Sequence, residues 1–190
     1  MKLVCGLGNP GTEYQGTRHN VGYVVCDILS LRHRIPLSGR KFQGRIGNGR
    51  IGSESVVMLK PYTYMNLSGR SVASAARFYK IEPMDLLVIH DDVDIEPGRI
   101  VVKFGGGTAG HKGLESVIRE RGDQDFIRVR FGVGHPENPF MDVSDYVLSR
   151  FEATELERIR ERLEVAADAV EAVLMEGYES AANRYNRKDQ

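Results

Sequence analysis

His19 and Asp91 are the two side chains whose predicted positions best suit acid–base chemistry. His19 precedes a predicted helix, so it lies near the positive end of a helix dipole, which disfavours the imidazolium and keeps the ring available as a base. Asp91 follows a buried strand and could accept a hydrogen bond from Nδ1–H, which fixes the tautomer and stabilises the charged ring. Because no serine lies in a G-x-S-x-G pattern and no cysteine has a suitable neighbour, water is the expected nucleophile.

The segment "HDDVD" at 90–94 also permits a divalent-metal hypothesis, since Asp91, Asp92 and Asp94 offer hard oxygen ligands. Consecutive residues of a strand point to opposite faces, however, so Asp91 and Asp92 are poor co-ligands. A polar cap between strand and loop is the simpler alternative. The prediction is a site without metal or cofactor.

The opening "GLGNPG" at 6–11 matches the G-x-G-x-x-G pattern of dinucleotide-binding loops. Such a loop needs a helix that starts at once, and here the first helical residue comes about nine residues too late. Asp27, at the distance expected for a ribose-binding acid, falls in a helix. We therefore interpret the turn as a device that presents Asn9 and leads into a polar loop carrying Tyr14, Arg18 and His19.

A second glycine-rich loop, within "KFGGGTAGHKGL" at 103–114, precedes a helix and favours anion binding. Lys112 falls in the first turn of that helix, where a cation opposes the dipole, which suggests an anionic partner. Lys103, Arg128 and Arg130 add charges that could hold a phosphate. Asn66, at the predicted start of another helix, is either a cap or a donor to a developing oxyanion.

Hydrophobic spacing predicts the elements that position these residues. Strands alternate with helices, which argues for an α/β fold: a single domain with a twisted mixed β-sheet flanked by helices and a long C-terminal amphipathic helix. The expected strands cover 2–7, 42–49, 51–60, 85–89, 99–104 and 126–134, and the second and third are expected to join at "GNGRIG". The expected helices begin at about Asn20, at about Asn66, after "GGGTAG" and at Leu156. Asn20 is suited to cap its helix, and the last helix is expected to break near Gly177.

Composition is that of an ordinary globular chain. The 190 residues are 41% hydrophobic and 27% charged, and no apolar run approaches the length of about 20 residues needed to span a bilayer. No secretory signal is recognisable, so a cytoplasmic protein is expected. Cys5 and Cys26 are expected to be reduced packing thiols. Residues 1–136 are net basic and 137–179 net acidic, which permits a polyanionic partner on one face.

Four longer motifs, in order, resemble signatures of the bacterial peptidyl-tRNA hydrolase family. They are "GLGNPGTEYQGTRHNVGY" at 6–23, "KPYTYMNLSGRSV" at 60–72, "HDDVDIEPG" at 90–98 and "KFGGGTAGHKGLESV" at 103–117, and the match continues through "FIRVRFGVGHP". The resemblance covers effectively the whole chain, 1–190, as one domain. It implies a monomeric α/β hydrolase without metal or cofactor that cleaves the ester between a peptide and the 3′ ribose of tRNA.

The resemblance also implies roles for individual residues. His19 would activate water with support from Asp91, while Asn9 and Asn66 would hold the peptide carbonyl region. Asn9 would also help to distinguish a blocked amino acid from one with a free amine. The substrate would further contact a set of side chains near the terminal nucleotide and peptide, namely Tyr14, Tyr64 and Met65, and Lys103 and Arg130 would sense the tRNA 5′ phosphate.

Lys112 departs from the family pattern, which usually has Asn after "GH". An amide both donates and accepts, whereas an ammonium only donates. We therefore expect Lys112 to contact a tRNA phosphate or the substrate carbonyl.

Two other functions remain open at this point: a non-catalytic RNA-binding relative of the same fold and a metal-dependent phosphoesterase. The presence of His19, Asp91, Asn9 and Asn66 together favours the enzyme. Residues 135–151, Pro-rich at their start, are predicted to form a lid over the substrate groove.

Overall fold

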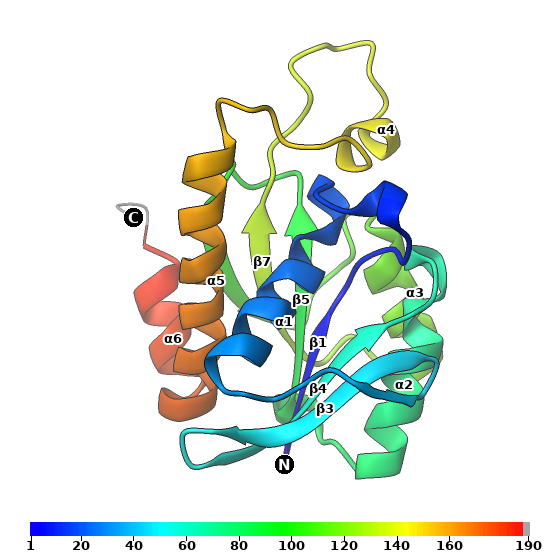
Figure 1. The fold of residues 1–190 in the computed structure, drawn as a ribbon, viewed down its shortest axis with the longest axis vertical. Coiled ribbons are helices and arrows are strands. Elements are labelled where there is room, and N and C mark those ends of the chain that lie inside the picture. Colours follow the sequence, from blue (N-terminus) through cyan, green and yellow to red (C-terminus); the bar gives the residue numbers. More distant parts are fainter. Residues whose placement is uncertain (188–190) are drawn as a thin grey trace.

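The computed structural model describes residues 1–187 and contains one seven-stranded mixed sheet in the order β2-β3-β4-β1-β5-β7-β6 (Figure 1). Helices cover both faces of the sheet. The strands are β1 (Lys2–Gly6), β2 (Gly39–Lys41), β3 (Gly44–Ile51), β4 (Glu54–Pro61), β5 (Leu86–Asp92), β6 (Ile100–Phe104) and β7 (Ile127–Gly132). The helices are α1 (Val21–Arg32), α2 (Ser68–Tyr79), α3 (Lys112–Arg121), α4 (Val143–Val147), α5 (Leu156–Glu176) and α6 (Tyr178–Tyr185).

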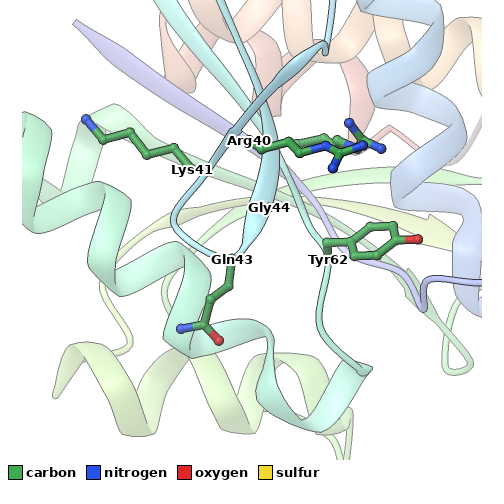
Figure 2. A pocket seen from close by; sticks show the side chains of 6 residues that line it. Arg40, Lys41, Gln43, Gly44 and Tyr62 are labelled. Atoms are coloured by element: carbon green, nitrogen blue, oxygen red, sulfur yellow. The ribbon is translucent and has the colours of Figure 1, made fainter.

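Four neighbouring strands run parallel, so their carboxyl ends meet at one edge of the sheet. Strand β1 pairs in parallel with β4 and β5, and β5 pairs in parallel with β7. Strands β2, β3 and β6 are antiparallel to their neighbours; β2 and β3 form a hairpin at one side of the sheet (Figure 2). In Figure 1 the chain around α4 arches beyond the carboxyl ends of β5 and β7. Sites in open α/β sheets form at such an edge.

Alternation along the central strands divides the core into two clusters, one on each face. Leu87 and Ile89 pack in the cluster that contains residues of α1, α5 and α6, whereas Leu86 and Val88 pack in the cluster that contains residues of α2 and α3. With a period of two, the same alternation directs Asp91 toward the α1 face. The carboxylate is thereby aimed at the residues that precede α1.

The first turn of α1 lies directly against the sheet because it contains Gly22. A Cβ at this position would come within 2.5 Å of the Ile89 carbonyl oxygen and 2.6 Å of the Leu7 backbone nitrogen. Any larger side chain would push α1 away from β1 and β5. Glycine here brings the residues just before α1 close to the end of β5.

The predicted fold class is confirmed, and most elements lie near their expected positions. The helix expected from Asn20 is α1, and the long C-terminal helix is α5, which ends before Gly177, a residue with φ 88°. Cys5 and Cys26 are buried and free, as expected, and burial raises the pKa of Cys26 to about 12. Among the described residues, no helix has both the length and the apolar character needed to cross a membrane.

Two local expectations are wrong. The "GNGRIG" segment at 47–52 is not the hairpin turn: most of it lies in β3, and the turn follows at 52–53. Glycine is needed there for packing, because a Cβ at Gly49 would meet Ile35 at 2.5 Å. Asn20 occupies the N-cap position of α1 but makes no side-chain cap hydrogen bond. The helix expected from about Asn66 is present: a short 3-10 turn over Met65–Leu67, which contains Asn66, leads directly into α2 at Ser68.

His90 is a buried histidine on the opposite side of β5 from Asp91. Its Nδ1 lies 2.6 Å from the carbonyl oxygen of Asp91, and its buried Nε2 has no hydrogen-bond partner among residues 1–187. Burial lowers the pKa of His90 well below its ordinary value, helped by the neighbouring His111. The ring is therefore neutral in the folded protein, with the Nδ1 proton donated to the backbone.

Replacing His90 should flatten the pH dependence of stability. Because the folded-state pKa is lowered, the unfolded chain binds more protons below pH about 6.5, and stability present above that pH is lost as the pH falls. His90→Asn keeps a donor near the position of Nδ1 but does not titrate. Between pH 7.5 and 5.5 the wild-type protein should lose about 1 kcal/mol more free energy of unfolding than the variant. Denaturant titrations at the two pH values measure this; parallel losses would contradict it.

Candidate active site

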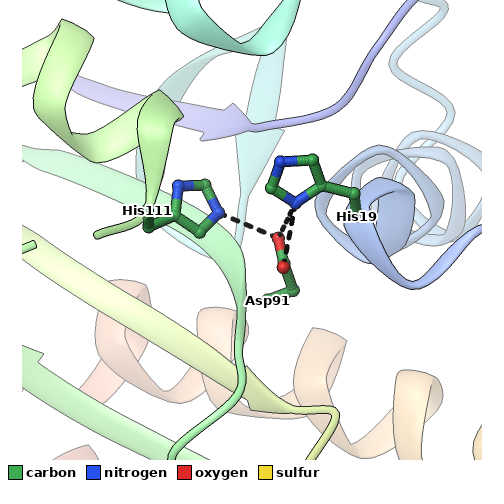
Figure 3. A group of neighbouring side chains, drawn as sticks. All are labelled: His19, Asp91 and His111. Carbon is green, nitrogen blue, oxygen red and sulfur yellow. Dashed lines mark hydrogen bonds and ion pairs between the residues drawn. The ribbon is translucent and has the colours of Figure 1, made fainter. Parts of the chain in front are cut away.

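His19 and Asp91 meet at the carboxyl end of β5, as predicted. His19 lies in a 3-10 turn over Arg18–Asn20 immediately before α1. Its Nδ1 is 2.9 Å from both carboxylate oxygens of Asp91, and both side chains are buried (Figure 3). Among the described residues, Nε2 of His19 has no hydrogen-bond partner. The pair therefore orients the ring with Nδ1–H toward the carboxylate and leaves the Nε2 lone pair available.

His111 is a third member of this cluster. Its Nε2 lies 2.9 Å from Oδ1 of Asp91, while its Nδ1 accepts hydrogen bonds from the backbone N–H groups of Gly113 and Leu114 at 3.1 and 3.3 Å. The histidine thus caps the N-terminus of α3. Since Nδ1 is an acceptor, the proton of the neutral ring is on Nε2 and is donated to Asp91.

The electrostatics of Asp91 depend on these two rings. Burial alone raises the pKa of this carboxyl, but the charges and hydrogen bonds of His111 and His19 outweigh burial and hold the pKa of Asp91 well below its ordinary value. The group is therefore a carboxylate throughout the physiological pH range. A negative charge at this position stabilises an imidazolium that forms on His19 when it takes up a proton.

Asn9 is held rigidly beside this cluster. Its Oδ1 accepts from the backbone N–H of Met65 at 2.7 Å, which leaves Nδ2 as its remaining donor. Asn20 fixes the backbone of the same residue: Oδ1 of Asn20 accepts from Asn9 N–H at 2.8 Å, and Nδ2 donates to Asn9 O at 2.9 Å. Asn20 therefore connects the turn after β1 to the loop that carries His19 instead of capping α1.

A cavity of about 690 Å³ opens at this edge of the sheet. It gathers many of the residues predicted for the site, together with residues of the expected lid. Its lining includes Asn9, His19, Tyr64, Met65, Asn66, Asp91, His111 and Lys112, and also His135, Val143, Ser144, Val147 and Leu148. Tyr14 is not part of the lining but packs edge to face against Tyr64, with ring centroids 6.4 Å apart. The cavity is large enough for a nucleotide-sized or small peptide group.

Lys112 and Asn66 lie at the rim of this cavity and keep exposed polar groups. Lys112 is the first residue of α3, as expected, and its Nζ is 3.1 Å from Glu115 Oε2. The Lys112 side chain is 67% exposed, so this ion pair contributes little to stability. Both side chains can therefore turn toward a bound molecule at small cost.

The expected phosphate-binding cations lie outside the cavity, on β6 and β7. Lys103 and Arg130 share one face of this antiparallel pair on diagonal positions, since Lys103 is opposite Arg128 and Arg130 is opposite Val101. Nε of Arg130 lies 2.9 Å from Asp92 Oδ2. Arg128 is not available to a phosphate, because it is buried and donates to the carbonyl oxygens of Gly106 and Gly107. Its function is to hold the glycine-rich loop.

Arg18 connects the residues before α1 to the segment expected to be a lid. Its buried guanidinium donates to Ser149 Oγ at 2.7 Å and to the Arg150 carbonyl at 2.6 Å, and it pairs with Glu155 at 3.1 Å. The same group lies over the rings of Tyr146 and Phe151, 4.4 and 4.9 Å from their centroids. These contacts fix one end of the segment next to His19; its closure over a substrate stays a prediction.

A metal ion could in principle be held by His19, Asp91 and His111, whose ligand atoms lie within 4.8 Å of one another. The hydrogen-bond pattern argues for protons at these positions instead. His111 carries its proton on Nε2, the atom that a metal would require to be free. The described Asp91, Asp92 and Asp94 do not converge either, because Asp92 pairs with Arg130 and Asp94 with His135.

A histidine ring held by a buried carboxylate, in a cavity at the carboxyl ends of parallel strands, is an arrangement that suits a hydrolase that activates water. Comparisons with known proteins identify the family. The family model described as peptidyl-tRNA hydrolase matches residues 3–190, so the chain belongs to the peptidyl-tRNA hydrolase family and the resemblance seen in the motifs is confirmed.

Relatives match along the full chain. The chain is 48% identical over 187 residues to a peptidyl-tRNA hydrolase of Symbiobacterium thermophilum, covering 97% of this chain and 98% of that protein. It is 47% identical over 189 residues to one of Geotalea daltonii, covering 100% and 98%. The crystal structure of peptidyl-tRNA hydrolase from Acinetobacter baumannii superimposes with a TM-score of 0.91 at 37% identity, covering 98% of this chain and 94% of that chain.

Sequence reasoning missed the roles of His111 and Asn20. His111 lies in a quoted motif, but its distance of 20 residues from Asp91 gives no signal that the side chains meet. Asn20 has the residue type of a cap, and its actual partner, Asn9, lies 11 residues away. The sequence shows that His111 and Asn20 are polar residues close to proposed site residues. It does not show which side chain each of them contacts.

Asp91→Asn should impair catalysis more than substrate binding. The amide keeps the size of the carboxylate but presents a donor to His19, which favours the wrong tautomer and removes the charge that stabilises the imidazolium. We expect kcat to fall by about 10³-fold or more and KM to change little. Steady-state hydrolysis assays measure both, with the exposed Asp168→Asn on α5 as control. A kcat near that of the wild type would contradict the role given to Asp91.

Arg18→Gln should release the segment that Arg18 holds. Loss of charge-assisted hydrogen bonds worth about 1.5–3 kcal/mol each should raise the local opening constant by about 10-fold or more. Amide hydrogen exchange over residues 143–151 should accelerate, while exchange in β5 stays slow. Arg150→Gln is the matched control, because only the backbone of Arg150 bonds to Arg18. Unchanged exchange over 143–151 would contradict the anchoring role.

Proposed function

We propose that this protein hydrolyses the ester bond between a peptide, or an N-blocked aminoacyl group, and the 3′ ribose of tRNA, which releases free tRNA for reuse in translation. The observation that carries the proposal is the His19 ring, bound through Nδ1 to both oxygens of buried Asp91, with Nε2 unpaired in the cavity. Membership of the family supports the same reaction.

The chemistry follows from this geometry. Nε2 of His19 takes a proton from a water molecule as the water oxygen attacks the ester carbonyl, and Asp91 stabilises the imidazolium. Nδ2 of Asn9, whose Oδ1 is engaged by Met65, is positioned to donate to the peptide carbonyl region. Collapse of the tetrahedral intermediate breaks the bond to the ribose oxygen, which receives the proton from His19. The products are a peptide carboxylic acid and tRNA with a free 3′ end.

The remaining contacts would place the tRNA. Asn66, Tyr64 and Met65 would contact the peptide and terminal nucleotide from the cavity wall, with Tyr14 supporting Tyr64. Lys103 and Arg130, on one face of β6 and β7, would bind the 5′ phosphate. The protein would act as a monomer in the cytoplasm, without a metal or cofactor.

Hydrolysis of blocked and unblocked aminoacyl-tRNA, measured side by side, tests this function. We expect the wild-type protein to deacylate N-acetylaminoacyl-tRNA and to leave the unblocked form largely intact, and His19→Ala to be inactive. Full activity of His19→Ala would overturn the assignment of the base. No hydrolysis by the wild type would favour the non-catalytic RNA-binding alternative, and loss of activity on chelation, restored by a divalent metal, would favour the metal-dependent one.

Lys112→Asn tests whether Lys112 contacts a tRNA phosphate. Removing one such contact should raise KM and lower the slope of log KM against log salt concentration by about 0.7–0.9. Lys80→Asn is a suitable control, because Lys80 is exposed at the end of α2 and has φ 51°, a conformation that Asn tolerates. An unchanged slope for Lys112→Asn would exclude the phosphate contact.

A further inference from the structure

Three cationic residues lie side by side across the first three strands of the sheet. In the strand register Arg40 of β2 is directly opposite Arg45 of β3, and Arg45 is directly opposite Lys60 of β4. Directly opposite residues of antiparallel strands project from the same face. We call Arg40, Arg45 and Lys60 the cationic row; it lies on the α1 side of the sheet, where Lys60 contacts Asp27 and the ring of Tyr23.

In the part of the chain that the structure describes, only Lys60 of the row has a carboxylate partner. Nζ of Lys60 lies 2.7 Å from both oxygens of Asp27. Within residues 1–187, Arg40 and Arg45 form no ion pair; the guanidinium of Arg45 instead lies over the ring of Tyr62, 5.8 Å from its centroid. Like charges placed directly opposite each other destabilise a sheet. The two arginines therefore make an unfavourable arrangement that an anion would relieve.

The row borders a hollow of about 420 Å³ lined by Arg40, Lys41, Gln43, Gly44, Arg45 and Tyr62. In Figure 2 the side chains of Arg40 and Tyr62 project to the same side of the hairpin, and Lys41 projects to the other. The Tyr62 ring is 61% exposed and offers a face for stacking. A surface that combines unpaired arginines with an exposed aromatic ring is typical of contacts with nucleic acid.

One short segment of the chain lines both the hollow and the active-site cavity. Tyr62 lines the hollow, and Tyr64, two residues later, lines the cavity. On the other side Tyr23 donates to the Pro61 carbonyl and packs against Gly8, next to Asn9. The row lies at the β2 side of the sheet, whereas Lys103 and Arg130 lie at the β6 side. The two sets of cations therefore lie on opposite sides of β5, which carries Asp91, and of β1, which leads into the turn that carries Asn9.

We propose that Arg40 and Arg45 bind consecutive phosphates of the RNA body of the substrate, with Tyr62 against a ribose or base; this rests on the function proposed above. The Cβ atoms of directly opposite residues lie about 5 Å apart, so two guanidinium forks that project from Arg40 and Arg45 suit a polymer with regularly repeated anions. An acidic peptide would be an alternative occupant, but its carboxylates have no fixed spacing along an unstructured chain. RNA backbone is therefore the partner that this geometry favours.

The test compares two substrates and two double variants. The substrates are N-acetylaminoacyl-tRNA and the N-acetylaminoacyl ester of a short single-stranded oligonucleotide with the tRNA 3′ sequence. For Arg40→Gln/Arg45→Gln we expect KM for the tRNA substrate to rise about 10-fold and the salt slope of log KM to fall by about 1.5, with kcat unchanged. The short substrate should show no change. Arg40→Lys/Arg45→Lys, which keeps the charge, should retain most of the salt slope.

A matched control is Arg160→Gln/Arg187→Gln, which removes the same charge from exposed positions on α5 and after α6. If this control changes KM as much as Arg40→Gln/Arg45→Gln does, the effect is one of net charge and the proposal fails. The proposal also fails if Arg40→Gln/Arg45→Gln has the same KM as the wild type on both substrates. That result leaves the proposed function intact. If Arg40→Gln/Arg45→Gln changes KM for the short substrate, and the change becomes larger as the attached peptide becomes more acidic, the occupant is an acidic peptide and the proposal fails. If the wild type hydrolyses neither substrate, the proposed function itself fails.

Discussion

Asp91 is a carboxylate that is only 2% exposed, and the surrounding site is organised to satisfy its charge. An uncompensated buried charge is costly, so donors must converge on it from the surrounding elements. The structure supplies two, from histidines that belong to different elements and have different tautomers. His111 is constrained by the backbone of α3, and its proton is committed to Asp91. Among the described residues His19 has no second partner, and its Nε2 is the atom that we propose to act as the base.

The rest of the fold serves this contact. The alternation of β5 turns Asp91 toward α1, and Gly22 lets the first turn of α1 lie directly against the sheet. Asn20 fixes the turn after β1 to the loop of His19, so that Asn9 and His19 keep one geometry. Arg18 extends the same connection to the segment that borders the cavity. A substitution at Gly22, Asn20 or Arg18 is therefore expected to shift the His19 ring, because only a few contacts separate each of them from it.

What the sequence predicted well is what depends on local periodicity. The α/β class, the helix after His19, the long α5 and the placement of Asp91 at the end of a buried strand follow from apolar spacing. The roles of His111 and Asn20 could not be predicted in this way, because side-chain hydrogen bonds between separate segments leave no periodic trace. Glycines in β3 were mistaken for a turn because close packing and tight turning select the same residue. Arg128 and Arg130 lie on the same face of β7, so the sequence does not distinguish them as phosphate ligands. The structure does, because Arg128 is buried and donates to carbonyl oxygens of the glycine-rich loop.

The tautomers of His19 and His111 are the most direct test of this account. Nitrogen-15 NMR of the histidine-labelled protein at a pH where both rings are neutral distinguishes a protonated from an unprotonated ring nitrogen at each position, with assignments from single histidine variants. We predict a proton on Nδ1 of His19 and on Nε2 of His111, both donated to Asp91. A proton on Nε2 of His19 would leave no base facing the cavity and would contradict the hydrogen bond from His19 Nδ1–H to Asp91.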